Sequence, residues 1–196
     1  MVTINVTPHI HPKLLGMLSD LGPAWRRAMF GVGATALRIE VVNHLRREAS
    51  VRHRTADRLE ARATGHLEKG AARVTSHASS DRATVNVPIA GIARAFRDLD
   101  IRPVRAKALT IPVSAAAYGH RVRELARMGW SIFRPKGHDV LMGSRDGGEA
   151  QALYALKKRV VVRQDRTLLP SDEAVASAIN KACAAYVQYE LTRRTA

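Results

Sequence analysis

The chain has 196 residues, of which 46% are hydrophobic and 25% charged, so it is long enough for one globular domain of ordinary composition. Lysine and arginine number 32 against 17 acidic residues, and the formal net charge of +15 favours an anionic partner. A single cysteine, Cys183, excludes a disulfide within the chain and a cysteine-based metal site, and no apolar run approaches the roughly 18 residues of a membrane span.

The N-terminal part of the chain predicts an arm followed by a long helix. Residues 1–23 begin with alternating apolar and polar side chains and contain two prolines, which predicts an N-terminal arm. Within it, residues 14–21 favour a short helix. Residues 24–50 predict a long amphipathic helix, because apolar side chains recur on one face. These side chains are Leu37, Val41 and Leu45.

Residues 51–80 differ from the rest of the chain in composition. They are polar and basic, and they contain almost no large apolar side chains. Gly65 and Gly70 interrupt the helix-forming residues of this stretch. We therefore predict an extended arm or loop at about 51–80 that protrudes from a single domain over residues 24–196 and becomes ordered on assembly.

Strand patterns begin after residue 80. Thr84–Val87 and Ala108–Ile111 each alternate apolar and polar residues or carry β-branched ones, and each ends at a proline. Between the second strand and the next one, Ser114–Met128 is predicted to be a helix with Ser114 as its N-cap. Gly129 is well placed to end that helix.

The C-terminal third predicts a hairpin, a strand and a helix. Trp130–Phe133 and Val140–Met142 flank a Pro-Lys-Gly turn, and a longer strand follows over Ala152–Arg163. The last element is a helix over Asp172–Thr192, capped by Ser171. The fold class is therefore α+β: a long N-terminal helix, a small and mainly antiparallel sheet, and a C-terminal helix packed on the sheet.

Motifs for catalysis are not found in the sequence. It contains no phosphate-binding glycine loop, no nucleophile elbow and no zinc-binding HExxH pattern. His9 and His11 form a pair without a third ligand nearby, so we predict no metal site. Cys183 falls near the apolar stripe of the last helix, which indicates a small buried hydrophobic residue and not a nucleophile. We predict that the protein is not an enzyme and has no cofactor.

Basic side chains gather in three groups that are candidates for contact with a partner or with DNA. Phosphate binding needs several such charges together, whereas a solvated basic surface is the alternative. Aromatic residues, which single-strand binders use for stacking, are not interleaved with them. The first group is Arg46, Arg47, Arg52, Arg54 and Arg58; the second is Arg102, Arg105 and Lys107; the third is Arg134, Lys136, Lys157, Lys158 and Arg159.

Several sequence blocks occur in an order that resembles a known family. The blocks are Thr64–Lys69, Thr84–Val87, Asp100–Val113 with its Ile-x-Pro and Leu-Thr-Ile-Pro segments, Ala117–Glu124, Leu153–Val160 with Leu-Lys-Lys, and Leu168–Asp172. Over roughly residues 34–192, this order resembles the virion-morphogenesis and tail-completion proteins of Mu-like and other long-tailed phages. The chain departs from that pattern at Arg166–Pro170, where many relatives have Arg-Pro-Phe-Leu, and at Asp98–Asp100, where a glycine pair is common.

The resemblance implies a structural virion protein at the head–tail junction or tail end. Its implied partners are other copies of itself, in a ring, together with portal, connector or tail proteins and DNA passing through the channel. Such a protein is found in the virion, and in the host cytoplasm during assembly. The family has no catalytic motif, so no active-site residue is carried over. The absence of a signal-peptide core or membrane span leads us to expect a soluble protein without a membrane partner. The alternative is a stand-alone basic nucleic-acid-binding protein.

Overall fold

The computed structural model describes residues 2–6, 22–52 and 54–195, and the chain within it forms two compact units. Unit 1 comprises Met1–Ser50, His66–Arg97 and Asp165–Ala196, and unit 2 comprises Val51–Gly65 and Asp98–Gln164. We expected a single domain over residues 24–196, whereas the contacts of the chain group into these two units. The fold class is α+β, as predicted.

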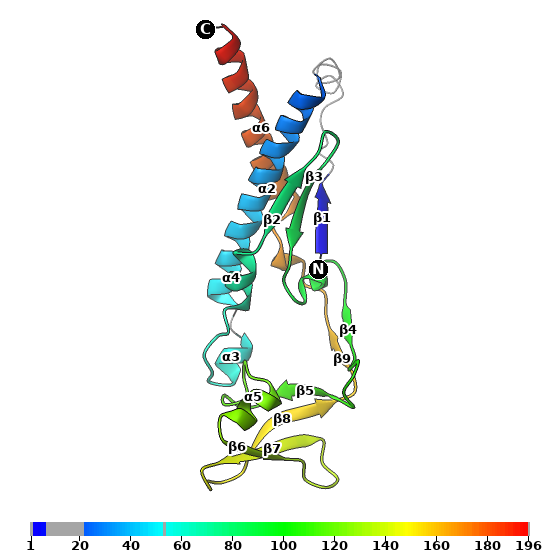
Figure 1. Ribbon diagram of the computed structural model, residues 1–196, viewed down its shortest axis with the longest axis vertical. Helices are drawn as coiled ribbons and strands as arrows, with labels where there is room; N and C mark the ends of the chain where they lie inside the picture. Colours follow the sequence, from blue (N-terminus) through cyan, green and yellow to red (C-terminus); the bar gives the residue numbers. More distant parts are fainter. Residues whose placement is uncertain (1, 7–21, 53, 196) are drawn as a thin grey trace. The chain divides into compact units, whose positions relative to one another are not determined.

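The long N-terminal helix of unit 1 is α2, Pro23–Val51 (Figure 1). Proline suits the first turn of a helix because its missing N–H would have no partner there. The helix buries one stripe with three- and four-residue spacing, as the sequence pattern predicts. The buried residues are Gly33, Ala34, Leu37, Val41 and Leu45.

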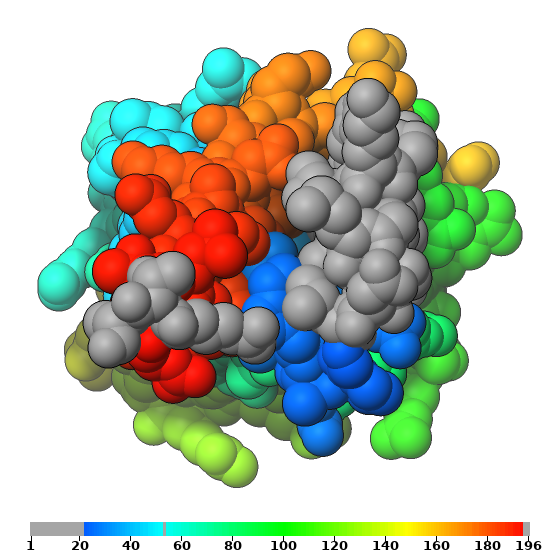
Figure 2. All heavy atoms as spheres, turned by 90° about the horizontal axis from the view of Figure 1, so that it is seen from above, coloured from blue at the N-terminus to red at the C-terminus, as the bar shows by residue number. Residues whose placement is uncertain are grey.

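The C-terminal helix is α6, Asp172–Thr195, and it begins where the sequence predicts. The Ser171 hydroxyl caps it by accepting a hydrogen bond from the Ala174 N–H at 3.3 Å. In Figure 2, α6 (orange to red) lies beside α2 (blue). The Trp25 and Tyr186 rings meet with centroids 6.2 Å apart, and a Cβ on Gly33 would lie 3.6 Å from Ile179.

The first sheet of unit 1 has three antiparallel strands in the order β1-β3-β2. They are β1, Val2–Val6; β2, Thr75–Ala78; and β3, Ala83–Val87. Strand β3 alternates buried and partly exposed residues, as expected of a strand that packs one face on a core. The N-terminal arm predicted for residues 1–23 therefore contributes β1 to this sheet, while residues 7–21, including the predicted short helix, lie outside the described residues.

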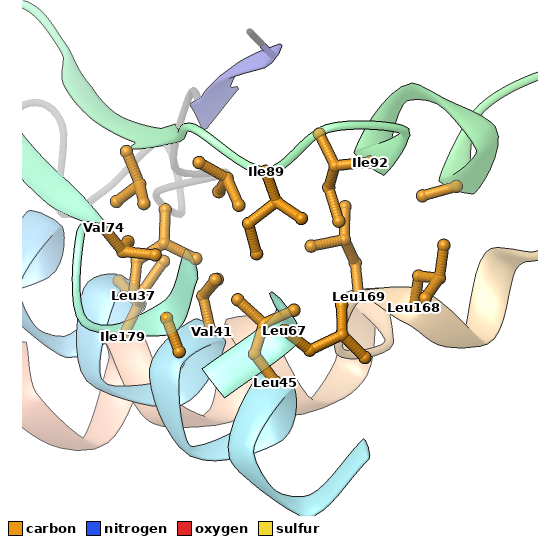
Figure 3. Packing of buried hydrophobic residues seen from close by; sticks show 14 residues of the cluster. Leu37, Val41, Leu45, Leu67, Val74, Ile89, Ile92, Leu168, Leu169 and Ile179 are labelled. Carbon is orange, nitrogen blue, oxygen red and sulfur yellow. The ribbon is translucent and has the colours of Figure 1, made fainter. Parts of the chain in front are cut away.

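The core of unit 1 joins helices, sheet and loops in one cluster (Figure 3). Leu37, Val41 and Leu45 of α2 point towards residues of the β3 region and of the segment that precedes α6. The short 3-10 helices Ile92–Ala95 and Arg166–Leu168 also contribute buried residues to this cluster. The C-terminal helix thus packs on the sheet, as predicted, since Ile179 belongs to the same cluster as Val85 and Val87.

Residues 51–80, expected to protrude as a basic arm or loop, instead form regular elements with buried side chains. They contain α3, Arg54–Arg58; α4, His66–Ala71; and β2. Leu67, Ala71 and Val74 follow each other at four- and three-residue spacing and belong to the core of unit 1.

Unit 2 contains two antiparallel sheets instead of one. In the first, β4, Leu99–Ile101, pairs with β9, Val160–Val162. The second, sheet C, has the order β5-β8-β7-β6. Its strands are β5, Leu109–Pro112; β6, Trp130–Phe133; β7, Val140–Arg145; and β8, Gln151–Lys157. The predicted hairpin is the antiparallel pair β6–β7.

One face of sheet C packs on a small core that includes α5, Val122–Arg127. A β-bulge shifts the register of β7 and β8, so that Leu141 pairs with Tyr154 and Met142 with Ala152. A bulge places consecutive residues on one face, and Leu153 and Tyr154 are accordingly both buried in this core. The Tyr154 hydroxyl donates a 2.9 Å hydrogen bond to the His120 carbonyl.

Two predicted elements of unit 2 are shorter than expected. The helix predicted over Ser114–Met128 is α5 alone, because Gly119 adopts a φ of 80° and ends the preceding turns. The N-cap is Arg121, whose N–H donates to the Glu124 carboxylate at 2.8 Å, and not Ser114. The strand predicted over Ala152–Arg163 is divided into β8 and β9, since the chain leaves sheet C to pair with β4.

Candidate functional site

The first basic group is divided between the two units. Arg46 and Arg47 lie on α2, and Arg47 forms a 3.2 Å ion pair with Glu40 of the same helix. Arg54 and Arg58 lie on α3 in unit 2, and Arg52 lies between the helices. The structure therefore places only part of this group on any one element.

The second and third groups are brought together in unit 2. Strand pairing sets Ile101 opposite Val160 and Leu109 opposite Lys157. The chain from 102 to 108 therefore lies opposite the short connection 158–159. We call the six exposed cations gathered here the cationic crest. It consists of Arg102, Arg105, Lys107, Lys157, Lys158 and Arg159.

A single carboxylate organises two arginines of the cationic crest. Asp100 accepts a hydrogen bond from Arg159 Nε at 2.9 Å and one from Arg102 Nε at 3.3 Å. The hydrogen bond from Arg159, together with Arg102, lowers the pKa of Asp100. The carboxylate stays ionised and holds two guanidinium groups, one from each stretch of the chain, on one face of the β4–β9 pair.

The remaining members of the third group lie in the β6–β7 turn. Arg134 Nη2 pairs with Asp139 at 2.8 Å, and its Nε donates to the His138 carbonyl at 3.0 Å. The Leu156 N–H donates to the Asp139 carbonyl at 2.8 Å, so this turn lies at the same end of sheet C as Lys157. Lys136 is exposed in the same turn. This end of unit 2 therefore concentrates positive charge.

Sheet C also carries an apolar face that its own core does not use. Residues opposite each other in an antiparallel ladder point to the same side. Besides the exposed Ala152, which pairs with Met142, the strand register therefore sets six apolar side chains opposite to the face that contains Tyr154. We call this set the outer face of sheet C. It consists of Leu109, Ile111, Phe133, Val140, Met142 and Ala155.

The outer face is partly open to solvent. None of its six residues belongs to the cluster around Leu125 and Leu153, and Phe133 is 48% exposed. The loop of the cationic crest adds another exposed apolar side chain, Val104, which is 95% exposed. Asp100, Val104 and the outer face were not predicted as functional from the sequence.

In unit 1, polar side chains form a clasp near the start of the last segment. Arg94 Nη2 pairs with Asp165 at 2.9 Å, and the Asp165 N–H donates to the Arg94 carbonyl at 2.8 Å. Asp165 also accepts a hydrogen bond from the Thr167 hydroxyl at 2.7 Å, and His44 Nε2 lies 2.9 Å from the Thr167 carbonyl. These contacts tie together three separate stretches of unit 1, which indicates a structural role.

His66, whose pKa is affected by Arg94 of the clasp, predicts an acid sensitivity of unit 1. Partial burial, and then the charge of Arg94, lower the pKa of His66 below its ordinary value of 6.5. The unfolded chain therefore binds the proton more readily, so unit 1 keeps its full stability above about pH 6.5 and loses some as the pH falls through the lower pKa of the folded state. We expect the protection of the Ile92–Ala95 amides against hydrogen exchange, measured relative to the intrinsic exchange rate at each pH, to be lower at pH 5 than at pH 7 in the wild type, and to fall less in His66→Gln. An equal fall in protection in both proteins would contradict this origin.

Cys183, His9 and His11 are the residues that the sequence offered as a nucleophile or as metal ligands. Cys183 packs against the core of unit 1, where burial raises the pKa of its thiol, in keeping with a small hydrophobic residue. His9 and His11 lie outside the described residues. Among the residues that the structure describes, no three His, Cys, Asp or Glu side chains are grouped so as to hold a metal ion, and no helix is long and apolar enough to cross a membrane.

Comparison with known proteins found no relative of this chain. The chain matches no known protein family, no curated protein sequence and no solved structure.

Proposed function

We propose that this chain is a structural phage virion protein that assembles in multiple copies at the head–tail junction or tail end. Its partners in this proposal are other copies of itself, arranged in a ring, and the portal, connector or tail proteins of the particle. The proposal takes its biological setting from the order of sequence blocks described above. It takes its physical support from the surfaces of unit 2.

The observation that carries the proposal is the outer face of sheet C. A four-stranded sheet with apolar side chains on both faces buries only one of them against the small core of its own unit. The hydrophobic effect favours covering the other face with a protein surface. We assign this role to a neighbouring copy in a ring, the assembly that head-to-tail contacts between identical subunits form when the rotation between neighbours closes.

The experiment replaces the apolar side chains without adding charge. The double variant Phe133→Ser/Met142→Ser removes two apolar side chains that pair with each other at the β6 edge of the outer face. Burial of each contributes about 1.5–3 kcal/mol, so the double variant should weaken the subunit contact by more than about 100-fold. Sedimentation velocity of the full chain and the amount of chain in purified particles measure the effect.

A matched control lies on the other unit. Ile39 on α2 is also 48% exposed, and Ile39→Ser should leave both assembly and particle composition unchanged. Circular dichroism checks that all variants fold. The proposal fails if the double variant assembles like the wild type, if the outer face binds a different particle protein instead of another copy, or if finished particles lack the chain.

The second candidate function is a nucleic-acid-binding protein that acts alone, and the cationic crest favours it. A protein of this kind binds DNA as a monomer or dimer with a steep dependence on salt. It would also be absent from particles. Particle composition therefore separates the two functions.

A further inference from the structure

We propose that the cationic crest binds the sugar–phosphate backbone of duplex DNA. The inference rests on the proposed function for the identity of its ligand, since DNA passes through the head–tail channel. It assigns the contact to one end of unit 2 and to six named residues, and it leaves the other basic groups outside the site.

The first support is that the fold gathers charges from distant parts of the sequence. The pairs Ile101–Val160 and Leu109–Lys157 fix both ends of the loop 102–108 against the connection 158–159. Strand pairing fixes the ends of both stretches, so the backbone that carries the cations is positioned before binding. A backbone that is already positioned loses less freedom when its side chains bind phosphate.

The second support is the balance of charge within the cationic crest. Asp100 is the carboxylate that pairs with Arg102 and Arg159. Among the described residues, no carboxylate forms an ion pair with Arg105, Lys107, Lys157 or Lys158. The crest therefore keeps a large excess of positive charge, in a protein that is itself strongly basic.

The third support concerns the form of nucleic acid. Single-strand binding uses aromatic side chains on which bases stack, and the two stretches of the cationic crest contain none. Contacts to backbone phosphates need only arginine and lysine in suitable positions. Arg102 and Arg159 are prepared for such contacts because Asp100 already orients their guanidinium groups.

Replacing Val104 can distinguish a nucleic-acid surface from a lipid surface. It is the most exposed large hydrophobic residue of the described chain and lies between Arg102 and Arg105. Insertion into an anionic bilayer would depend on this apolar tip as well as on the cations. Contact with backbone phosphates depends on the cations alone.

The test measures binding of the full chain to a fluorescent 30-base-pair duplex by anisotropy over a range of salt concentrations. Six phosphate contacts give a slope of log K against log salt of about −5, and three give about −3. Lys107→Gln/Lys157→Gln/Lys158→Gln removes three cations that lack a carboxylate partner among the described residues. We expect the slope to change by about 2 to 3 and the affinity at low salt to fall by at least about tenfold.

The control removes the same charge elsewhere. Arg26→Gln/Arg27→Gln/Arg73→Gln changes three exposed arginines of unit 1 and should change the slope by less than about one. Equal losses in the two triple variants would show that only net charge matters, and would overturn the proposal. Wild-type chain that fails to bind the duplex would also overturn it.

A second comparison uses Val104→Ser and vesicles that contain phosphatidylserine. We expect this variant to keep the wild-type affinity for the duplex, and we expect the wild type to prefer the duplex to the vesicles. Stronger binding to vesicles, lost in Val104→Ser, would overturn the proposal in favour of a lipid surface. Loss of DNA binding leaves the assembly proposal intact, because the Phe133 and Met142 experiment does not involve the cationic crest.

Discussion

Replacing Leu45 with alanine should lower the free energy of unfolding of unit 1 by about 2–5 kcal/mol. Leu45 is fully buried, and it lies in the cluster to which α2, α4 and the segment before α6 all contribute. Removing its side chain leaves a cavity that these elements can close only in part, because several of them meet at this point.

The measurement for Leu45→Ala must separate the two units, since a chain with two compact units need not unfold in one step. Native-state hydrogen exchange at the amides of β3 reports the stability of unit 1, and exchange at β7 reports that of unit 2. We expect a loss of protection in β3 only. Ile39→Ala on the same helix removes a half-exposed side chain and should change the stability by less than about 0.5 kcal/mol. A similar loss in both variants would mean that burial in the core does not determine the effect, since alanine favours the helix at both positions.

The second large effect is expected at Gly143 in unit 2. A Cβ on this residue would overlap with Leu153 Cδ1 and would lie 3.4 Å from the Ser131 carbonyl oxygen. Leu153 has no exposed surface, so its side chain cannot turn out into solvent. Gly143→Ala should therefore destabilise unit 2 by about 1–3 kcal/mol through overpacking.

A double-mutant cycle tests the cause of the Gly143 effect. Leu153→Ala alone should destabilise unit 2 by about 2–5 kcal/mol through the cavity that it creates. If the added methyl group clashes with Leu153, then Gly143→Ala in the Leu153→Ala background should have almost no further effect. Additive losses in the double variant would instead locate the strain at the Ser131 carbonyl. Hydrogen exchange at the amides of β6 and β8 measures the loss of stability in the single and double variants.

Local sequence patterns predicted the elements whose periodicity, cap or turn is visible within the element itself. The four-residue spacing of Leu37, Val41 and Leu45 was sufficient for α2, and Ser171 marked the start of α6. The turn chemistry between residues 133 and 140 was sufficient for the β6–β7 hairpin. In each case the pattern that specifies the element lies within the element or directly beside it.

Elements that depend on distant pairing could not be predicted in this way. The strand expected over 152–163 is broken because β9 pairs with β4, about 60 residues earlier, and nothing at Lys158 indicates that partner. The helix expected from Ser114 begins later because Gly119 takes a left-handed conformation. A glycine inside a helical pattern is compatible with such a break, but it does not require one.

The candidate surfaces were predicted in part. The cations of the cationic crest were found because charge is visible in the sequence, but their convergence depends on the strand register. The outer face of sheet C has a recognisable pattern in the sequence. Val140–Met142 and Leu153–Leu156 are continuous apolar runs, which indicate strands with apolar side chains on both faces.

The order in which the chain is made bears on how its two units form. Unit 1 is built from three separate stretches, and the last of them supplies Leu168, Leu169 and Ile179 to the core around Leu45. Unit 2 ends at Gln164, so all of its residues are translated before that last stretch. The inserted unit therefore has its complete set of residues earlier than unit 1, whereas the apolar stripe of α2 cannot complete its core until Leu168, Leu169 and Ile179 have been added.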